Sequence, residues 1–303
     1  MNNEETLINY VIEICNKNGL GKVWSCKRQN IGFNRIVYSV NDMFIIKICI
    51  NYEKEPGIIN EIQYYIDNPN YFNPKLITYD TSKETIPYIY TVEEKINGSN
   101  LFNVWGNLNG IQREQCLNEL VQILKKIHKP ADQKNEAIAN ILLKYDEYLN
   151  RLKSSNLLSA DKICYLSELR NILTIYFENA CFGFTHGDIH FNNVIYSDEG
   201  LKLIDFECYD ITPLDKDFDS INRMVRNPNS LIKKGLQSSV NPKDYEKIMY
   251  YLIQNYPEVC QMDNFENRLL IYDCINSLKW LNVYPEHKPY HDILFTKSKK
   301  LIK

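Results

Sequence analysis

The feature that most constrains this chain is the segment THGDIHFNNVIYSDEGLKLIDFE at positions 185–207. His186 and Asp188 stand in the order H-x-D, Asn193 follows after four further residues, and Asp205 precedes a Phe. Between Asn193 and Asp205 lie two short strand-like runs, NVIY and LKLID, joined by the turn sequence Ser-Asp-Glu-Gly. We expect the ends of this tight strand pair to bring the polar side chains together.

Phosphoryl transfer accounts for this set of residue types. One carboxylate can orient the hydroxyl group that accepts the phosphoryl group, while an Asn and a second Asp supply the oxygen ligands that Mg²⁺ prefers on nucleotide phosphates. The competing interpretation is a polar loop in which His186 and Asp188 only bond to the backbone, because Asp, Asn and Gly are common in turns. We favour the functional interpretation, since three acids and amides bracket one strand pair. The nearby His190 fits a packed histidine better than a substrate contact.

Composition excludes several classes of protein. The chain is 44% hydrophobic and 24% charged, as in globular proteins, and its 303 residues are enough for two domains. A formal net charge of -3 gives no basic excess of the kind that nucleic-acid binding needs. There is no 18-residue apolar run and the start MNNEETL is polar, so we expect no membrane partner and a cytoplasmic location. The nine cysteines lack a C-x-x-C spacing, which indicates reduced thiols.

The spacing of apolar residues predicts two parts of different structure. A helix at 4–18 precedes three strand-like runs within 22–50, a short helix and two further strand-like runs. We therefore expect an α+β protein with a small antiparallel-sheet lobe at 1–97 that ends in a hinge, and a mostly helical lobe at 98–303. A cleft between the lobes is the expected ligand site. The helices expected in the second lobe are 111–128, 136–152, 159–179, 243–256 and 263–283.

The central segment resembles the catalytic and metal-binding loops of the aminoglycoside phosphotransferase and choline kinase superfamily, whose motif reads H-G-D-L/I-H-x-x-N followed by I-D-F or I-D-W. The resemblance implies a two-lobed protein-kinase-like fold. It also implies that Asp188 is the catalytic carboxylate, that His186 stabilises its loop, and that Asn193 and Asp205 hold Mg²⁺. Protein kinases usually carry Arg in place of Gly187, and choline kinases typically replace the first Gly of the motif with Asn, so the antibiotic-kinase branch is favoured.

The first lobe contains candidate nucleotide-binding residues. Lys47 lies within the apolar run FIIKICI, where a lone cation is costly unless it is paired or reaches solvent or phosphate. Glu61, in the next predicted helix, is its natural partner, because a strand Lys paired with a helix Glu holds the α and β phosphates in kinases. The alternative is that Lys47 faces water on an alternating strand.

Two further nucleotide contacts rest on the resemblance. The run QNIGFNRIVYSV at 29–40 is similar to the phosphate-covering loop of antibiotic kinases, which implies that Gly32 and Asn34 approach the nucleotide. The run TVEEKINGSNL at 91–101 resembles the linker whose backbone binds the purine edge, and it places Glu94 and Ile96 there. The expected donor is ATP or GTP.

The acceptor is less constrained by the sequence. Acidic residues after position 206, among them Glu207, Asp210 and Asp217, would attract a polycationic aminoglycoside, although Asp217 could instead cap a helix. Trp280, with Tyr284 close by in sequence, could form an aromatic cage for a quaternary ammonium group. We therefore expect transfer to a hydroxyl group of a small cationic molecule, with an aminoglycoside favoured. The alternatives are a choline, ethanolamine or other metabolite kinase and a non-catalytic nucleotide-binding protein.

The assignment of Asp188 leads to a direct prediction. Asp188→Ala should abolish turnover but leave nucleotide binding intact, because the carboxylate orients the acceptor and does not hold the nucleotide. Steady-state rates and nucleotide titrations of the purified variant test both parts. Unchanged rates in this variant would refute the assignment.

Overall fold

The structure is a computed structural model that describes residues 3–29, 35–70, 72–231 and 240–302. The predicted nucleotide contacts Gly32 and Asn34 lie outside the described residues. The chain divides into two compact units: Met1–Val104 with Phe191–Tyr209 form the first, and Trp105–His190 with Asp210–Lys303 form the second. Each unit is described by itself. The functional division at residues 97 and 98 stays a prediction.

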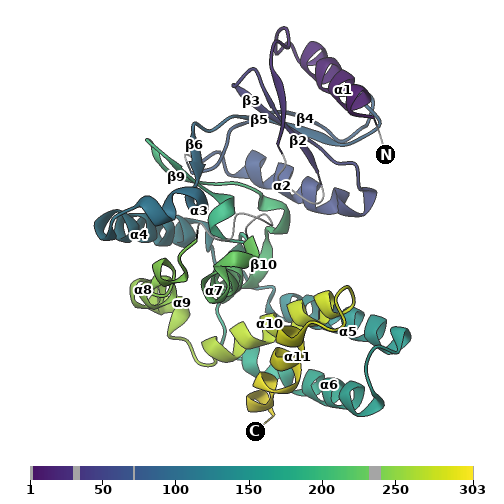
Figure 1. Ribbon diagram of the computed structural model, residues 1–303, viewed down its shortest axis with the longest axis vertical. Helices are drawn as coiled ribbons and strands as arrows, with labels where there is room; N and C mark the ends of the chain where they lie inside the picture. Colours follow the sequence, from purple (N-terminus) through teal and green to yellow (C-terminus); the bar gives the residue numbers. More distant parts are fainter. Residues whose placement is uncertain (1–2, 30–34, 71, 232–239, 303) are drawn as a thin grey trace. The chain divides into compact units, whose positions relative to one another are not determined.

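A five-stranded antiparallel sheet forms the centre of the first unit (Figure 1). Its strand order is β1-β2-β3-β5-β4. The turn between β2 and β3 has Asn41 and Asp42 at its centre, with positive φ angles of 54° and 57°, and the Met43 N–H closes it with a 3.0 Å hydrogen bond to the carbonyl oxygen of Val40. The strands are β1 (Cys26–Gln29), β2 (Ile36–Val40), β3 (Phe44–Ile48), β4 (Leu76–Asp80) and β5 (Tyr90–Glu94).

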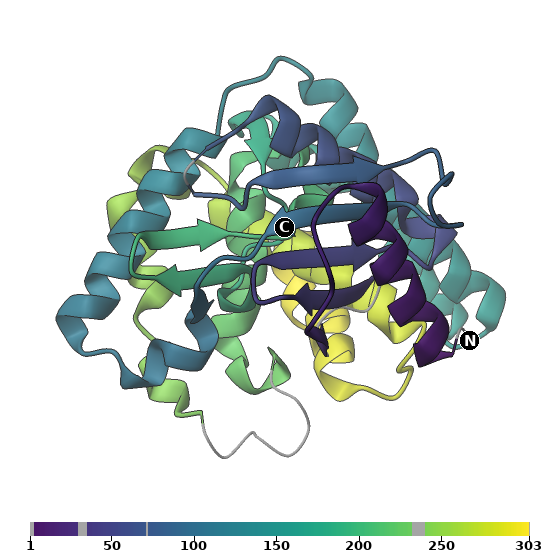
Figure 2. The same ribbon diagram turned by 90° about the horizontal axis from the view of Figure 1, so that it is seen from above.

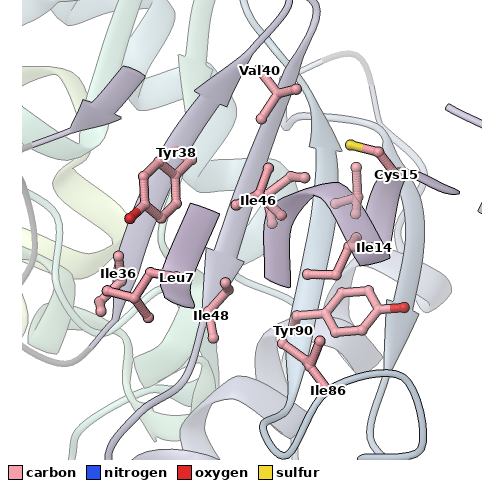
Figure 3. Close-up of a cluster of buried hydrophobic side chains, with 12 residues drawn as sticks. Leu7, Ile14, Cys15, Ile36, Tyr38, Val40, Ile46, Ile48, Ile86 and Tyr90 are labelled. Atoms are coloured by element: carbon pink, nitrogen blue, oxygen red, sulfur yellow. The ribbon is translucent and has the colours of Figure 1, made fainter. Parts of the chain in front are cut away.

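Helices cover both faces of this sheet, α1 (Glu4–Lys17) on one and α2 (Glu55–Asp67) on the other (Figure 1). The apolar residues of α1 recur at helical spacing, so that one face of the helix is buried against β2, β3 and β5. Figure 2 shows α1 lying in front of these strands, and Figure 3 shows Leu7 beside Ile36 and Ile48 of the sheet and Ile14 beside Tyr90. This order of strands, helix and strands is the one that the sequence predicts.

A smaller three-stranded sheet completes the first unit. Its strand order is β6-β8-β9, and the strands are β6 (Gly98–Asn100), β8 (Val194–Ser197) and β9 (Gly200–Leu203). The short helix α3 (Leu101–Val104) follows β6 directly in the chain. A Cβ atom at Gly98 would lie 2.5 Å from the carbonyl oxygen of Tyr196, so the approach of β6 to β8 requires glycine there. β8 and β9 are the strand pair that the sequence predicts, including its Ser-Asp-Glu-Gly turn.

The second unit is mostly helical. α10 is buried along most of its length and contacts α5, α7 and α11. The helices are α4 (Gly110–Ile127), α5 (Lys134–Ser155), α6 (Ala160–Ile172), α7 (Asp217–Arg226), α8 (Ile248–Asn255), α9 (Pro257–Cys260), α10 (Phe265–Leu281) and α11 (Lys288–Phe295). Of the helices in the described ranges, none combines the length and apolar character needed to span a bilayer.

Several elements of the second unit differ from the sequence expectations. The helix expected at 159–179 ends at Ile172 and continues as a 3-10 helix, Leu173–Phe177. Two short strands that the sequence did not predict, β7 (Phe182–Thr185) and β10 (Asp210–Pro213), pair antiparallel. Each strand has only four residues, which is too short a run to show the alternation that identifies a strand from sequence.

The packing of α1 gives a test of the first unit. Ile14→Ala should lower the free energy of unfolding by about 2–5 kcal/mol, because Ile14 is fully buried and its removal leaves a cavity. The matched control is Ile12→Ala on the same helix, since Ile12 is 39% exposed and should change stability by about 0.5 kcal/mol or less. Thermal denaturation compares the two variants. Equal losses would contradict the placement of α1.

Candidate active site

The predicted metal ligands Asn193 and Asp205 lie at the open end of the β8–β9 hairpin. Val194 pairs with Leu203 in this hairpin, and the Ile204 N–H donates a 3.0 Å hydrogen bond to the carbonyl oxygen of Asn193. Asn193 is buried, whereas the Asp205 side chain is 36% exposed. The hairpin thus brings the two residues together, and their role as metal ligands stays a prediction.

Aromatic packing fixes the backbone that follows Asp205. Asp205 has a left-handed conformation with φ 71°, which is uncommon outside glycine, and it leads into the 3-10 helix Phe206–Cys208. The Phe206 ring is buried and stacks on Tyr64 of α2 with 3.8 Å between ring centroids. Tyr65 meets the same ring edge-on at 5.7 Å. The aromatic contacts therefore hold Asp205 close to α2.

Lys47 on β3 is buried and has two carboxylate partners. Its Nζ lies 3.0 Å from Oε1 of Glu61 on α2, the predicted partner, and 2.6 Å from Oε1 of Glu93 on β5. Burial raises the pKa of Glu93 even though Lys47 opposes this change. Sequence reasoning missed Glu93. The available signal was a carboxylate within the apolar run PYIYTVEE on a strand that could pair with the Lys47 strand.

Arg35, the residue before β2, is a second buried cation that sequence reasoning missed. Its Nη1 donates to Oε2 of Glu61, and its Nη2 donates to Oδ1 of Asp205. The same Nη2 lies 3.9 Å from Oε2 of Glu207. Burial alone would raise the pKa of Glu61, but Arg35 and Lys47 lower it to about 2. Glu61 is therefore an ionised carboxylate held between two cations.

The predicted purine contacts Glu94 and Ile96 lie at and just beyond the end of β5. The Glu94 N–H donates a 2.9 Å hydrogen bond to the carbonyl oxygen of Lys75, so this donor is already used within the first unit. The Glu94 side chain is exposed and Ile96 is half-buried. Their contact with a purine stays a prediction.

In the second unit, Asp217 anchors the loop that carries Asp188. Its Oδ2 accepts a 3.0 Å hydrogen bond from the His186 N–H, and its Oδ1 accepts a 2.6 Å bond from the Gly187 N–H. A ring nitrogen of His128, Nε2, lies 2.9 Å from Oδ2. Gly187 has φ 82°, a conformation that favours glycine, and this allows both N–H groups to point at one carboxylate.

The burial of Asp217 corrects its predicted part in acceptor binding. Asp217 is fully buried, with both carboxylate oxygens bonded inside the unit, and it makes no side-chain cap of α7. Burial alone would raise the pKa of this carboxyl group, but His128 holds it below the ordinary value. The prediction failed because a run of acidic residues does not indicate which of them face inwards. Asp217 is therefore removed from the proposed acceptor contacts.

The Asp188 carboxylate is held by residues from α7. Ser220 Oγ donates a 2.7 Å hydrogen bond to Oδ1 of Asp188, and Arg223 Nη2 donates a 2.7 Å bond to Ser220 Oγ. The Asp188 side chain is 42% exposed, and its Oδ2 lies 3.8 Å from His190 Nε2. Within the loop, the Asp188 N–H donates to Nδ1 of the buried His186 at 3.4 Å. Ser220 and Arg223 carried no sequence signal beyond their helical spacing.

The other predicted acceptor residues are dispersed. Glu207 belongs to the first unit, beside Arg35, and Asp210 is an exposed residue at the start of β10 in the second. Trp280 on α10 is half-buried and stacks on Tyr284 with 6.0 Å between ring centroids. The two acids therefore lie in different units, and the part of the Trp280–Tyr284 pair in acceptor binding stays a prediction.

Comparisons with known proteins give the family and the fold. Residues 68–229 match the model of the family described as "Phosphotransferase enzyme family". ADP-bound aminoglycoside phosphotransferase APH(2'')-Ib is similar in structure, with TM-score 0.68 and 15% identity over 95% of this chain and 98% of that one. The streptomycin–ATP complex of APH(2'')-IIa is similar with TM-score 0.65 and 14% identity, over 100% of this chain and 97% of that one. A choline/ethanolamine kinase family protein from Mesorhizobium loti is similar with TM-score 0.61 and 15% identity, over 98% of this chain and 95% of that one.

These likenesses confirm the predicted fold class. At these identities, the solved structures establish a kinase-like α+β fold, with antiparallel sheets in one part and helices in the other. No curated protein sequence matches the chain.

The anchor at Asp217 predicts a pH-dependent loss of stability. A carboxyl group whose pKa is lowered by folding stabilises the fold at pH values above its pKa in the unfolded chain, which is near 3.8. This contribution is lost as the pH falls through the lower pKa of the folded state. Asp217→Asn should therefore cost about 3–5 kcal/mol near neutral pH and less at about pH 3. Thermal denaturation at both pH values measures the difference. Asp210→Asn, at an exposed site in the same unit, is the control, and an equal loss for Asp217→Asn at both pH values would contradict an ionised anchor.

Proposed function

Because the chain belongs to the phosphotransferase enzyme family, we propose that it transfers the γ-phosphoryl group of ATP or GTP to a hydroxyl group of a small molecule. The observation that carries the proposal is the support of Asp188. Its loop is bonded through two backbone N–H groups to the buried Asp217, and Ser220 fixes one of its carboxylate oxygens. A carboxylate held in this way and still 42% exposed suits the orientation of an acceptor hydroxyl.

Residues of the first unit supply the nucleotide-binding groups of the proposal. Lys47 would contact the α and β phosphates, and Glu61 keeps its ammonium group in place. Glu93 adds a second carboxylate to the same ammonium group, so Lys47 stays charged although it is buried. We keep residues 1–97 as the proposed nucleotide-binding lobe, with Glu94 and Ile96 at the purine.

Mg²⁺ fits the oxygen donors at the open end of the β8–β9 hairpin. Asn193 and Asp205 offer one amide and one carboxylate, both hard ligands. In the described ranges no group of three or more His, Cys, Asp or Glu residues could enclose a metal, which suits an ion that takes its other ligands from phosphates and water. When bound, Mg²⁺ would offset the charge of the phosphates. Asn193 and Asp205 orient the donor, and Asp188 orients the acceptor and takes its proton.

The proposed acceptor is an aminoglycoside, and the proposed role is antibiotic resistance in the cytoplasm. Several similar structures are aminoglycoside phosphotransferases, some of them complexes with streptomycin or gentamicin. The acidic field expected for a polycation is weaker than the sequence suggests, because Asp215, Asp219 and Asp273 are buried and paired with Arg or Lys side chains. Asp210 remains as an exposed acid.

A second candidate acceptor is choline or a related amine. The stacked pair Trp280 and Tyr284 supports it, since aromatic faces bind quaternary ammonium groups. Tyr290 belongs to the same region: burial raises its pKa, Tyr284 adds to the rise, and Arg223 opposes it. Because Arg223 also bonds to Ser220, Tyr290 lies within electrostatic reach of the group that holds Asp188.

One assay separates the candidates. Nucleotide consumption by the purified chain, with Mg²⁺ and either ATP or GTP, should be stimulated by at least one aminoglycoside in a panel that also contains choline, ethanolamine, homoserine and simple sugars. Asp188→Ala run in parallel identifies contaminating kinases, because it should remove the stimulation. Stimulation by choline alone would replace the antibiotic acceptor, and stimulation by no compound would favour a nucleotide-binding protein without turnover.

A further inference from the structure

Arg35 is a buried cation to which the proposed chemistry gives no role. Its side chain is 6% exposed, and its two terminal nitrogens bond to carboxylates from different elements, Glu61 of α2 and Asp205 after β9. Burial alone would lower the pKa of Arg35, but Glu61, Asp205 and Glu207 raise it above its ordinary value. The guanidinium is thus permanently charged and sits on the carboxylate proposed to bind Mg²⁺.

The pairing of charges in the first unit explains why Arg35 matters to Asp205. Lys47 is held by Glu61 and Glu93, so its ammonium group is already shared between two carboxylates. Arg35 is in direct contact with Asp205. It gives this carboxylate the positive partner that a metal ion would otherwise supply.

A divalent cation cannot bind the same carboxylate without affecting this contact. Mg²⁺ on Asp205 and the guanidinium on Oδ1 would be like charges within a few ångströms, and their repulsion is only partly screened because the guanidinium is buried. Glu207 offers the guanidinium another partner, since its Oε2 lies 3.9 Å from Arg35 Nη2. A small shift of the guanidinium would exchange one carboxylate for the other and leave the bond to Glu61 in place.

We propose that Arg35 occupies the metal-binding carboxylate Asp205 in the nucleotide-free protein, and that Glu207 receives the guanidinium when Mg²⁺ binds with the nucleotide. The inference rests on the proposed function, because it takes Asp205 as a metal ligand. Arg35 is then a positioning residue that competes with the metal and sets the Mg²⁺ concentration needed for nucleotide binding. A purely structural clamp between α2 and the hairpin would instead support metal binding.

The test measures ADP affinity by calorimetry over a range of Mg²⁺ concentrations, using the full chain without acceptor. The readout is the Mg²⁺ concentration at half-maximal enhancement of ADP affinity, so turnover is not required. Arg35→Gln should lower this midpoint about tenfold, since it removes a charge that competes for Asp205. An unchanged or raised midpoint would overturn the proposal. Arg28→Gln is the matched control, because Arg28 on β1 is an exposed arginine of the same unit, paired with Glu4.

A substitution of Glu207 gives a second, independent test of the proposal. Glu207→Gln should raise the Mg²⁺ midpoint, since the displaced guanidinium loses its second partner. The same substitution in the Arg35→Gln background should have little effect, because there is then no guanidinium to receive. An equal rise in both backgrounds would show that Glu207 acts only through its charge, and would overturn the exchange.

Two outcomes separate this inference from the proposed function. If Mg²⁺ does not change ADP affinity in the wild-type chain, the metal site and the proposed function both fail. If wild type responds and Arg35→Gln does not differ from it, only the role of Arg35 fails. If thermal denaturation shows that Arg35→Gln is unfolded, the Mg²⁺ midpoint of Arg35→Lys is measured in its place. One ammonium group cannot bridge Glu61 and Asp205 as a guanidinium does, so the midpoint should fall, and no change would overturn the proposal.

Discussion

The first unit depends on one buried carboxylate, that of Glu61. A carboxylate without water is unfavourable unless cations and hydrogen bonds replace the solvent, and here Arg35, Lys47 and the hydroxyl group of Tyr65 do so. These partners come from α2 itself, from β3 and from the residue before β2. Through Arg35 the constraint reaches Asp205 after β9. Loss of either cation would leave an uncompensated charge, so the network couples the sheet, the helix and the hairpin.

The second unit repeats this principle with Asp217. Its carboxylate is buried beneath the loop of Asp188 and takes two backbone N–H groups and His128 as partners. His128 is in turn bonded through Nδ1 to the hydroxyl group of Tyr256 at 3.0 Å. Backbone N–H groups on an irregular loop must find acceptors, and one ionised side chain from the first turn of α7 meets that need. The conformation of the loop therefore depends on a residue about thirty positions away in sequence.

Much of the candidate site could be predicted because its residues act through local patterns. The order H-x-D and Asn, followed by Asp-Phe, lies within one short segment, and the tight hairpin inside it brings Asn193 and Asp205 together. Lys47 could be paired with Glu61 because a cation in an apolar strand needs a partner and the next helix carries Glu61 within its apolar stretch past Pro56. The acceptor residues were less predictable. Asp217 was a candidate for acceptor binding or for a helix cap, because the periodicity of a ten-residue polar helix does not reveal that its acids are paired inside.

By itself, the sequence determined the kinase-like α+β class, the strand pair that carries Asn193 and Asp205, and the partnership of Lys47 with Glu61. The kinase-like class follows from the resemblance of the central segment, the strand pair from spacing along a short stretch, and the partnership from an apolar run that cannot hold a lone charge. Only the tertiary structure decided that Glu93, Arg35 and Ser220 join these groups and that Asp217 points inwards. The reason is physical: which buried charges meet is set by strand register and by packing between elements far apart in the chain, and neither leaves a local pattern in the amino-acid order.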